Sequence, residues 1–146
     1  MLDLAAKLQL RQGQSLLCFG CPALLLPRLP DPPPASDGGP VDAVLGFCAT
    51  PEQVGRQLPA LLTRLRSGGL LWMAFRKGQK PPALTRDHGW QALEAKGYET
   101  VRAIALDAEW SALRFRHSSE KATDLLERVA LIRIHSGVKD RAQRTV

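Results

Sequence analysis

The stretch LLWMAFRK, residues 70–77, decides the predicted fold. It follows a Ser-Gly-Gly turn at residues 67–69, and a continuous apolar run entered through glycines is typical of a strand buried on both faces of a sheet. The run ends in Arg76 and Lys77, so the strand carries two cations to one edge of the sheet. We therefore expect a core strand with a basic group at its carboxyl end.

Two apolar runs precede this strand and predict its neighbours. SLLCFG (15–20) and VDAVLGFCA (41–49) are short and are bounded by glycine and proline, as buried strands are. A helix is expected to begin at Thr50, because proline follows this residue and glutamine lies three residues later. Pro59 interrupts the apolar stripe of that helix and predicts a kink or two abutting helices. Gly68 is expected to end it.

The second half of the chain predicts one more helix and a pair of strands. Thr85 is expected to cap the helix, and Gly97 to end it. Residues 100–107 and 111–117 alternate between apolar and polar side chains, and their short connection predicts an antiparallel pair. The expected fold is α/β and Rossmann-like, with a mostly parallel sheet, an antiparallel C-terminal strand pair and helices on both faces.

The chain is expected to divide into a Rossmann-like domain, residues 1–117, and a C-terminal extension, residues 118–146. The apolar residues of the extension favour two alternatives, a cover for the sheet edge or a homodimer contact through residues 118–135. Its basic end carries no interleaved aromatic residues and no recognition module. A nucleic-acid partner is therefore not expected, although a nucleic-acid accessory protein stays as a second alternative.

Composition predicts a globular cytoplasmic protein. Apolar residues make up 45% and charged residues 23% of the 146 positions, without a run long enough to span a membrane and without an export signal. Three cysteines are too few for a disulfide framework, and buried structural thiols are favoured over a redox or metal site. Seven basic residues and no acidic residue lie from Gln53 to Arg86, which favours an anionic partner or a solvated helix face.

A candidate site follows from strand direction. Ligands of an open parallel sheet bind outside the carboxyl ends of its strands, so the residues that follow the predicted strands form the candidate set. The members near the last two strands join this edge only if the strand at residues 100–107 runs parallel with the others. The predicted ligand-binding residues are Gly20, Thr50, Arg76, Lys77, Arg86, Asp107, Trp110, Ser111 and Arg114.

Several of these residues have a second, structural interpretation. Lys77 is either an anion-binding residue or a lysine that extends from a strand end into solvent. Trp110 lies in a predicted turn and is a candidate for stacking on a ligand ring. Arg114 is either a ligand contact or the partner of Asp107 or Glu109 across the hairpin. No catalytic residue and no metal ligand is assigned.

Three segments carry a resemblance to a known family. Leu71-Trp72 followed by Lys77, then the run LTRD at residues 84–87, and finally WSALRF at residues 110–115 resemble a bacterial family of small proteins of unknown function. The resemblance covers roughly residues 4–116, and the family's proline before the lysine is Arg76 in this chain. It implies a fold similar to that of S-adenosylmethionine-dependent methyltransferases, without a transferable activity.

The residues expected for that cofactor are incomplete. Gly20 is followed by Cys-Pro and not by the further glycines of a cofactor-binding turn. About twenty proline-rich residues separate Gly20 from Val41, which is short for two crossovers, and Asp31 is the only plausible ribose-binding acid. We therefore expect a non-catalytic binding or interaction module that holds a small anionic molecule and no cofactor. The alternative is a divergent S-adenosylmethionine-dependent methyltransferase.

Overall fold

The structure, a computed structural model, describes residues 4–29 and 39–119. Residues up to Arg116 belong to one compact unit, and a second unit begins at His117. In the described part of the second unit, the Nδ1 atom of His117 lies 2.8 Å from the hydroxyl oxygen of Ser119. The predicted homodimer segment lies almost wholly outside the described residues, so the C-terminal extension and its dimer contact stay predictions.

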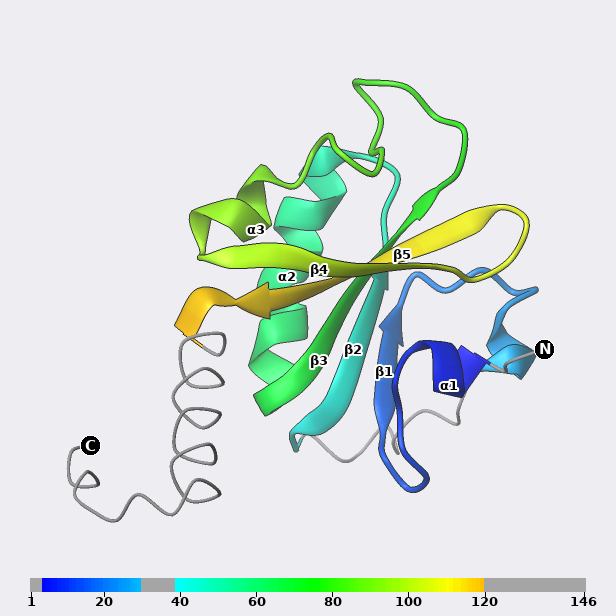
Figure 1. Cartoon of the computed structure of the whole chain (residues 1–146), viewed down its shortest axis with the longest axis vertical. Coiled ribbons are helices and arrows are strands. Elements are labelled where there is room, and N and C mark those ends of the chain that lie inside the picture. The colour runs from blue at the N-terminus through cyan, green and yellow to red at the C-terminus, as the bar shows by residue number, and fades with distance from the viewer. Residues whose placement is uncertain (1–3, 30–38, 120–146) are drawn as a thin grey trace, which may run out of the picture. The chain divides into compact units, whose positions relative to one another are not determined.

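Five strands form one mixed sheet in the order β1-β2-β3-β5-β4 (Figure 1). The first three, β1 (Leu16–Phe19), β2 (Val41–Phe47) and β3 (Leu65–Arg76), run parallel. The next, β5 (Trp110–His117), pairs antiparallel with β3, and β4 (Tyr98–Ala105) lies beyond it at the edge. The predicted α/β, Rossmann-like class with an antiparallel C-terminal strand pair is confirmed.

Helical segments cover both faces of this sheet (Figure 1). Helices α2 (Pro51–Arg64) and α3 (Gln91–Ala95) pack on the face that we call the α2 face. Helix α1 (Leu4–Lys7) and Leu25, which precedes the 3-10 helix η1 (Leu26–Arg28), pack on the opposite α1 face. Successive side chains of a strand alternate between these faces, so each face has its own apolar core. No helix in the described ranges is long and apolar enough to cross a membrane.

The start of α2 is as predicted and its end is not. The Thr50 hydroxyl oxygen accepts a 3.2 Å bond from the Gln53 backbone N–H, and α2 then continues through Pro59 as one helix. The expected end at Gly68 is wrong, because the helix ends at Arg64. Leu65 is already extended and pairs with β2, so β3 begins five residues before the apolar run.

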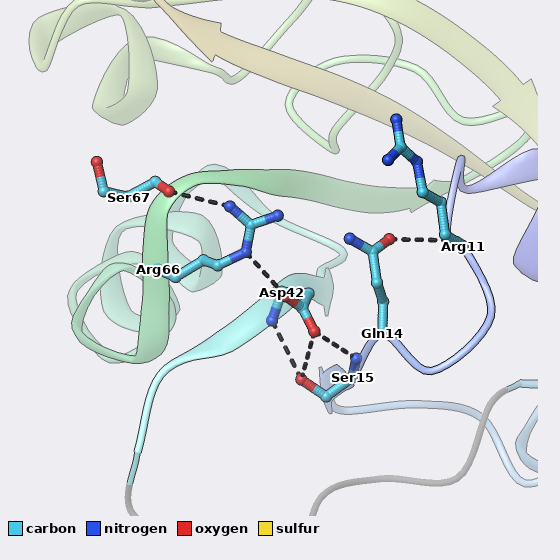
Figure 2. A network of polar contacts seen from close by, with 6 residues as sticks. All are labelled: Arg11, Gln14, Ser15, Asp42, Arg66 and Ser67. Atoms are coloured by element: carbon cyan, nitrogen blue, oxygen red, sulfur yellow. Dashed lines mark hydrogen bonds and ion pairs between the residues drawn. The ribbon is translucent and has the colours of Figure 1, made fainter.

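The early start of β3 is held by a polar network at the amino ends of the strands (Figure 2). The Asp42 carboxylate accepts bonds from the Ser15 backbone N–H at 2.7 Å and from Arg66 Nε at 2.8 Å. The Ser15 hydroxyl adds a 3.2 Å bond to the same carboxylate. These bonds join the starts of three strands across a register shift between β2 and β3.

Loss of the Asp42 charge is expected to weaken the fold in a pH-dependent way. The Ser15 backbone N–H and the Arg66 guanidinium lower the pKa of Asp42 below its ordinary value of 3.8. Its contribution is therefore complete above that value and is lost as the pH falls through the lower folded pKa. Asp42→Asn should reduce the free energy of unfolding by about 1–3 kcal/mol at neutral pH, measured by urea denaturation.

The matched control for this substitution is Asp87→Asn, because Asp87 is exposed and its carboxylate has no hydrogen-bond or ion-pair partner in the described part of the chain. Its backbone N–H donates to the Thr85 hydroxyl. The control should change stability by less than about 0.5 kcal/mol. The difference between Asp42→Asn and the unmodified chain should shrink when the pH falls below 3.8. An unchanged difference there would contradict the electrostatic account of this network.

The predicted helix at Thr85 is wrong, because α3 begins only at Gln91. Thr85 instead forms an isolated bridge with His88. The reason is the buried indole of Trp90, whose Nε1 donates to the backbone carbonyls of Thr85 at 2.9 Å and Arg86 at 3.2 Å. These bonds join Trp90 to the turn at residues 85–88, where the Thr85 carbonyl also accepts the His88 backbone N–H. The expected end near Gly97 is confirmed, since this residue follows α3 with a φ of 88°.

Candidate functional site

The carboxyl end of β3 lies beside the turn that joins β4 to β5. The Lys77 backbone N–H donates a 2.8 Å bond to the Glu109 carbonyl, and Arg76 pairs with Trp110. The end of β4 therefore lies at the same edge as the end of β3, which is the arrangement on which the predicted site depends. We call residues 76–80 together with residues 107–110 the basic edge.

The turn at this edge is fixed by Asp107. Its Oδ1 atom accepts bonds from the backbone N–H groups of Glu109 at 2.8 Å and Trp110 at 2.7 Å. A carboxylate that satisfies two turn amides is a common device for fixing a tight connection. Asp107 thus positions the turn, and its bonded oxygen is already satisfied by the backbone.

Arg76 is the central cation of the basic edge. Its guanidinium carbon lies 5.4 Å from the centroid of the Trp110 ring, a distance at which a cation is attracted to an aromatic face. Its Nη2 atom lies 3.8 Å from Oε2 of Glu109, and both side chains are more than half exposed, at 53% and 61%. Exposed pairs at such distances are weak, so the guanidinium remains accessible to an anion from solvent.

Trp110 is a core residue and not an open stacking surface. Only 8% of it is exposed, and its ring meets Phe47 edge-on with centroids 5.1 Å apart. Arg76 lies over the same ring. The indole therefore has little area left for a ligand ring, and its visible effect is to orient the guanidinium.

The other predicted residues do not gather with Arg76. Ser111 pairs with Phe75, whose ring belongs to the core on the α2 face, whereas Trp110 belongs to the core on the α1 face. Arg86 is exposed, and its carbonyl accepts from the Trp90 indole, also in the α2-face core. Strand alternation divides the predicted set between the two faces.

Arg114 lies away from the edge. It pairs with Trp72 in the middle of β3, because β5 runs antiparallel and leads away from the carboxyl ends. Its Nη1 atom donates a 2.9 Å bond to Oε1 of Gln9. This bond goes to Gln9, and not to Asp107 or Glu109, which were the expected partners across the hairpin.

Thr50 and Gly20 have local structural explanations. The Thr50 hydroxyl caps α2, and the Gln53 side-chain oxygen accepts a 2.6 Å bond from the Ala49 backbone N–H. Gly20 has a φ of 72°, a backbone conformation that favours glycine, where the chain leaves β1. A Cβ atom at Gly20 would lie 3.3 Å from the Phe47 carbonyl oxygen.

Gln57 occupies the region beside Gly20, and sequence reasoning missed it. Its Nε2 atom donates a 3.0 Å bond to the Phe47 carbonyl and would lie 3.7 Å from a Cβ at Gly20. Its Oε1 atom is buried without a hydrogen-bond partner in the described part of the chain, 2.5 Å from where a Cβ of Gly46 would lie. The Gln57 amide therefore lies beside the glycine turn.

The residues present do not fit S-adenosylmethionine, the cofactor implied by the resemblance. A Rossmann-type ligand approaches the glycine turn in a crevice where the strand order reverses. The described parallel strands follow one another without a reversal, and the Gln57 amide lies beside Gly20. No acid directly follows β2, and Asp31 lies outside the described residues.

Two lysines extend the basic edge beyond Arg76. Lys77 and Lys80 are exposed, and among the described residues neither ammonium group has a hydrogen-bond or ion-pair partner. Lys80 and Glu109 were not in the predicted set. Glu109 could have been predicted from the sequence, because it lies in the hairpin turn between Asp107 and Trp110, beside the end of β3.

A surface hollow of about 370 Å³ lies elsewhere, beside α1. Ala5, Ala6 and residues 10–14 line it, and Arg11 is its charged residue. Residues 10–14 precede β1, so the hollow adjoins the amino end of that strand and does not coincide with the basic edge.

The cysteines behave as structural thiols. Burial raises the pKa of the Cys18 and Cys48 thiols to about 12 and also raises the pKa of Cys21. Thiols that stay protonated are poor nucleophiles and poor metal ligands. Within residues 4–29 and 39–119, no group of three or more His, Cys, Asp or Glu side chains is arranged to hold a metal ion.

Comparison with known proteins yields structural likeness only. No model of a protein family and no curated protein sequence matches the chain. The resemblance to a bacterial family of unknown function therefore stays a prediction.

Three solved structures show a likeness to this chain, and two of them are named as a methylase or a methyltransferase. Fibrillarin from Aeropyrum pernix, with natively bound S-adenosyl-L-methionine, has 16% identity, covers 73% of this chain and 67% of its own, and gives a TM-score of 0.48. The ribosomal protein L11 methylase from Lactobacillus delbrueckii subsp. bulgaricus has 18% identity and a TM-score of 0.39, with 57% and 39% of the two chains covered. Magnesium protoporphyrin IX methyltransferase from Synechocystis PCC 6803, with bound SAM, has 15% identity and a TM-score of 0.39, with 57% and 42% covered.

This chain thus spans about two fifths of the length of two of these proteins. At such identities and scores, the likeness concerns the arrangement of the α/β fold and says nothing of activity.

Proposed function

We propose that this chain is a binding module that holds a small anion at the basic edge and transfers no chemical group. The observation that carries the proposal is the placement of Arg76, whose guanidinium is oriented over Trp110 at the carboxyl edge of the sheet. An arginine held by an aromatic face is already oriented for a ligand, because part of the entropy cost of ordering its side chain has been met.

The charges around Arg76 support an anionic ligand. Lys77 and Lys80 are exposed in the loop that follows, and no acidic residue occurs in the run from Gln53 to Arg86. Glu109 is the acid within ion-pair distance of Arg76, and its pairing is weak because both groups are exposed. A dissociation constant of about 1 mM to 10 μM would correspond to about 4–7 kcal/mol, which is compatible with two or three charge-assisted contacts.

The second candidate is a divergent S-adenosylmethionine-dependent methyltransferase, and the methyltransferase-like fold favours it. Such an enzyme would need its glycine turn at Gly20 to approach the cofactor. The amide of Gln57 and the carbonyl of Phe47 occupy that region, which speaks against this candidate. The cofactor itself would supply an electrophilic methyl group, for which the described residues offer no completed site.

Calorimetric titration of the unmodified chain separates the two candidates. We expect binding heat with inorganic phosphate, used as the simplest anionic probe, and none with S-adenosylmethionine at millimolar concentration. The phosphate titration should weaken as salt increases, because exposed charges are screened. Heat with S-adenosylmethionine and none with phosphate would replace the binding-module proposal by the methyltransferase.

A further inference from the structure

The Glu109 carboxylate lies where an anion bound to Arg76 would compete with it. Its Oε2 atom is 3.8 Å from Arg76 Nη2, and its own carbonyl accepts the backbone N–H of Lys77 at 2.8 Å. Asp107 fixes the Glu109 amide at 2.8 Å, so the turn keeps this acid beside the strand end. The backbone of the acid is thus tied to the site on both sides, while its side chain remains 61% exposed.

Resting on the proposed function, we infer that Glu109 is an internal placeholder that competes with a bound phosphate group for Arg76. The turn holds a monocarboxylate beside Arg76 at a high effective concentration. A free monocarboxylate would offer Arg76 the same chemistry and would pay the additional entropy cost of association. The tethered carboxylate therefore lowers the apparent affinity of Arg76 for every anion by the same factor, and a ligand with stronger contacts than a carboxylate keeps a measurable affinity.

A phosphate group has the required chemistry. It carries about −1.5 to −2 charges at neutral pH and three strong acceptor oxygens, so it can contact a guanidinium and an ammonium group together. Arg76 and Lys77 are consecutive residues, and Lys80 follows in the same loop. The ring of Trp110 is packed against Phe47, so the ligand gains little from an aromatic base. The ligand class is therefore inorganic phosphate or a compact phosphomonoester.

The experiment titrates the full chain with phosphate, glycerol phosphate and acetate at one fixed salt concentration. The unmodified chain should bind both phosphate probes, and acetate at least about tenfold more weakly. Equal affinity for acetate would overturn the assignment of phosphate as the ligand class. Binding of inorganic phosphate alone would identify the free ion as the ligand, whereas tighter glycerol phosphate binding would identify a phosphomonoester.

The placeholder role is tested by Glu109→Gln, which removes the charge and keeps the shape of the side chain. Phosphate affinity should rise about two- to fivefold, as expected for release of an exposed ion pair. Glu94→Gln is the matched control, because Glu94 is an exposed acid on α3 and its loss changes the net charge equally. An equal rise in the control would show a general charge effect and would overturn the placeholder role.

A double-variant cycle separates the inference from the proposed function. In an Arg76→Gln background, Glu109→Gln should leave the remaining phosphate affinity unchanged, since the competed group is gone. If the unmodified chain binds phosphate and Glu109→Gln has no effect, only the inference about Glu109 fails. If neither the unmodified chain nor Glu109→Gln binds any of the three anions, the proposed function itself fails.

Discussion

Trp110→Ala is expected to lower the free energy of unfolding by about 3–5 kcal/mol, as measured by urea denaturation. Trp110 is only 8% exposed, its ring meets the Phe47 ring edge-on, and it belongs to the apolar core on the α1 face. Truncation would remove a large apolar surface and leave a cavity beside Phe47. A loss of this size would mean that Trp110 stabilises the core and is not a stacking surface for a ligand.

Two comparisons make this result specific. Trp110→Phe keeps an aromatic ring against Phe47 and should cost clearly less than the alanine variant. Val101→Ala on β4, a partly exposed apolar position, should cost less than about 1 kcal/mol. A Trp110→Ala protein with unchanged stability and lost ligand binding would contradict the core assignment and restore a stacking role.

The combined variant Arg76→Gln with Lys77→Gln is expected to weaken phosphate binding about 100-fold and to leave stability nearly unchanged. Each lost charge-assisted contact is worth about 1.5–3 kcal/mol, so two such contacts correspond to tenfold or more each. Both side chains are exposed, and the backbone bonds of this strand end do not depend on them. Calorimetry gives the affinity, and thermal denaturation gives the stability.

Arg102→Gln with Lys96→Gln is the matched control, since it also removes two exposed cations and lies on β4 and at the end of α3. This control should change phosphate affinity only through the weak long-range field of the protein. A large drop in melting temperature of the Arg76 and Lys77 variant would assign these residues to the fold and not to a ligand.

The sequence predicted the sheet because its strands are short apolar runs separated by glycine and proline. It misplaced the start of β3, since Leu65 to Gly69 have no apolar periodicity and are held by the Asp42 carboxylate of another strand. It placed a helix start at Thr85 because a capping pattern depends on neighbouring residues alone and contains no information about the packing of Trp90. There, the Trp90 indole donates to the carbonyls of Thr85 and Arg86, and the chain forms a turn before α3 begins at Gln91.

The candidate site was predicted in its position along the sheet and not in its membership. Strand order was enough to bring Lys77 beside the turn of Glu109. Arg114 was included on strand direction alone, although an antiparallel strand carries its later residues away from the edge. Gln57 could not be found from sequence, since its position beside Gly20 depends on how α2 packs on β2.

The most direct test of the central claim is amide NMR of the unmodified chain during titration with inorganic phosphate. We expect saturable chemical-shift changes confined to the basic edge, at residues 76–80 and at the turn amides of Glu109 and Trp110. When S-adenosylmethionine is added instead, the amide signals of Gly20 and Gln57 should not shift. Saturable shifts of Gly20 and Gln57 with S-adenosylmethionine, together with unchanged signals of the basic edge in phosphate, would contradict phosphate binding at this edge.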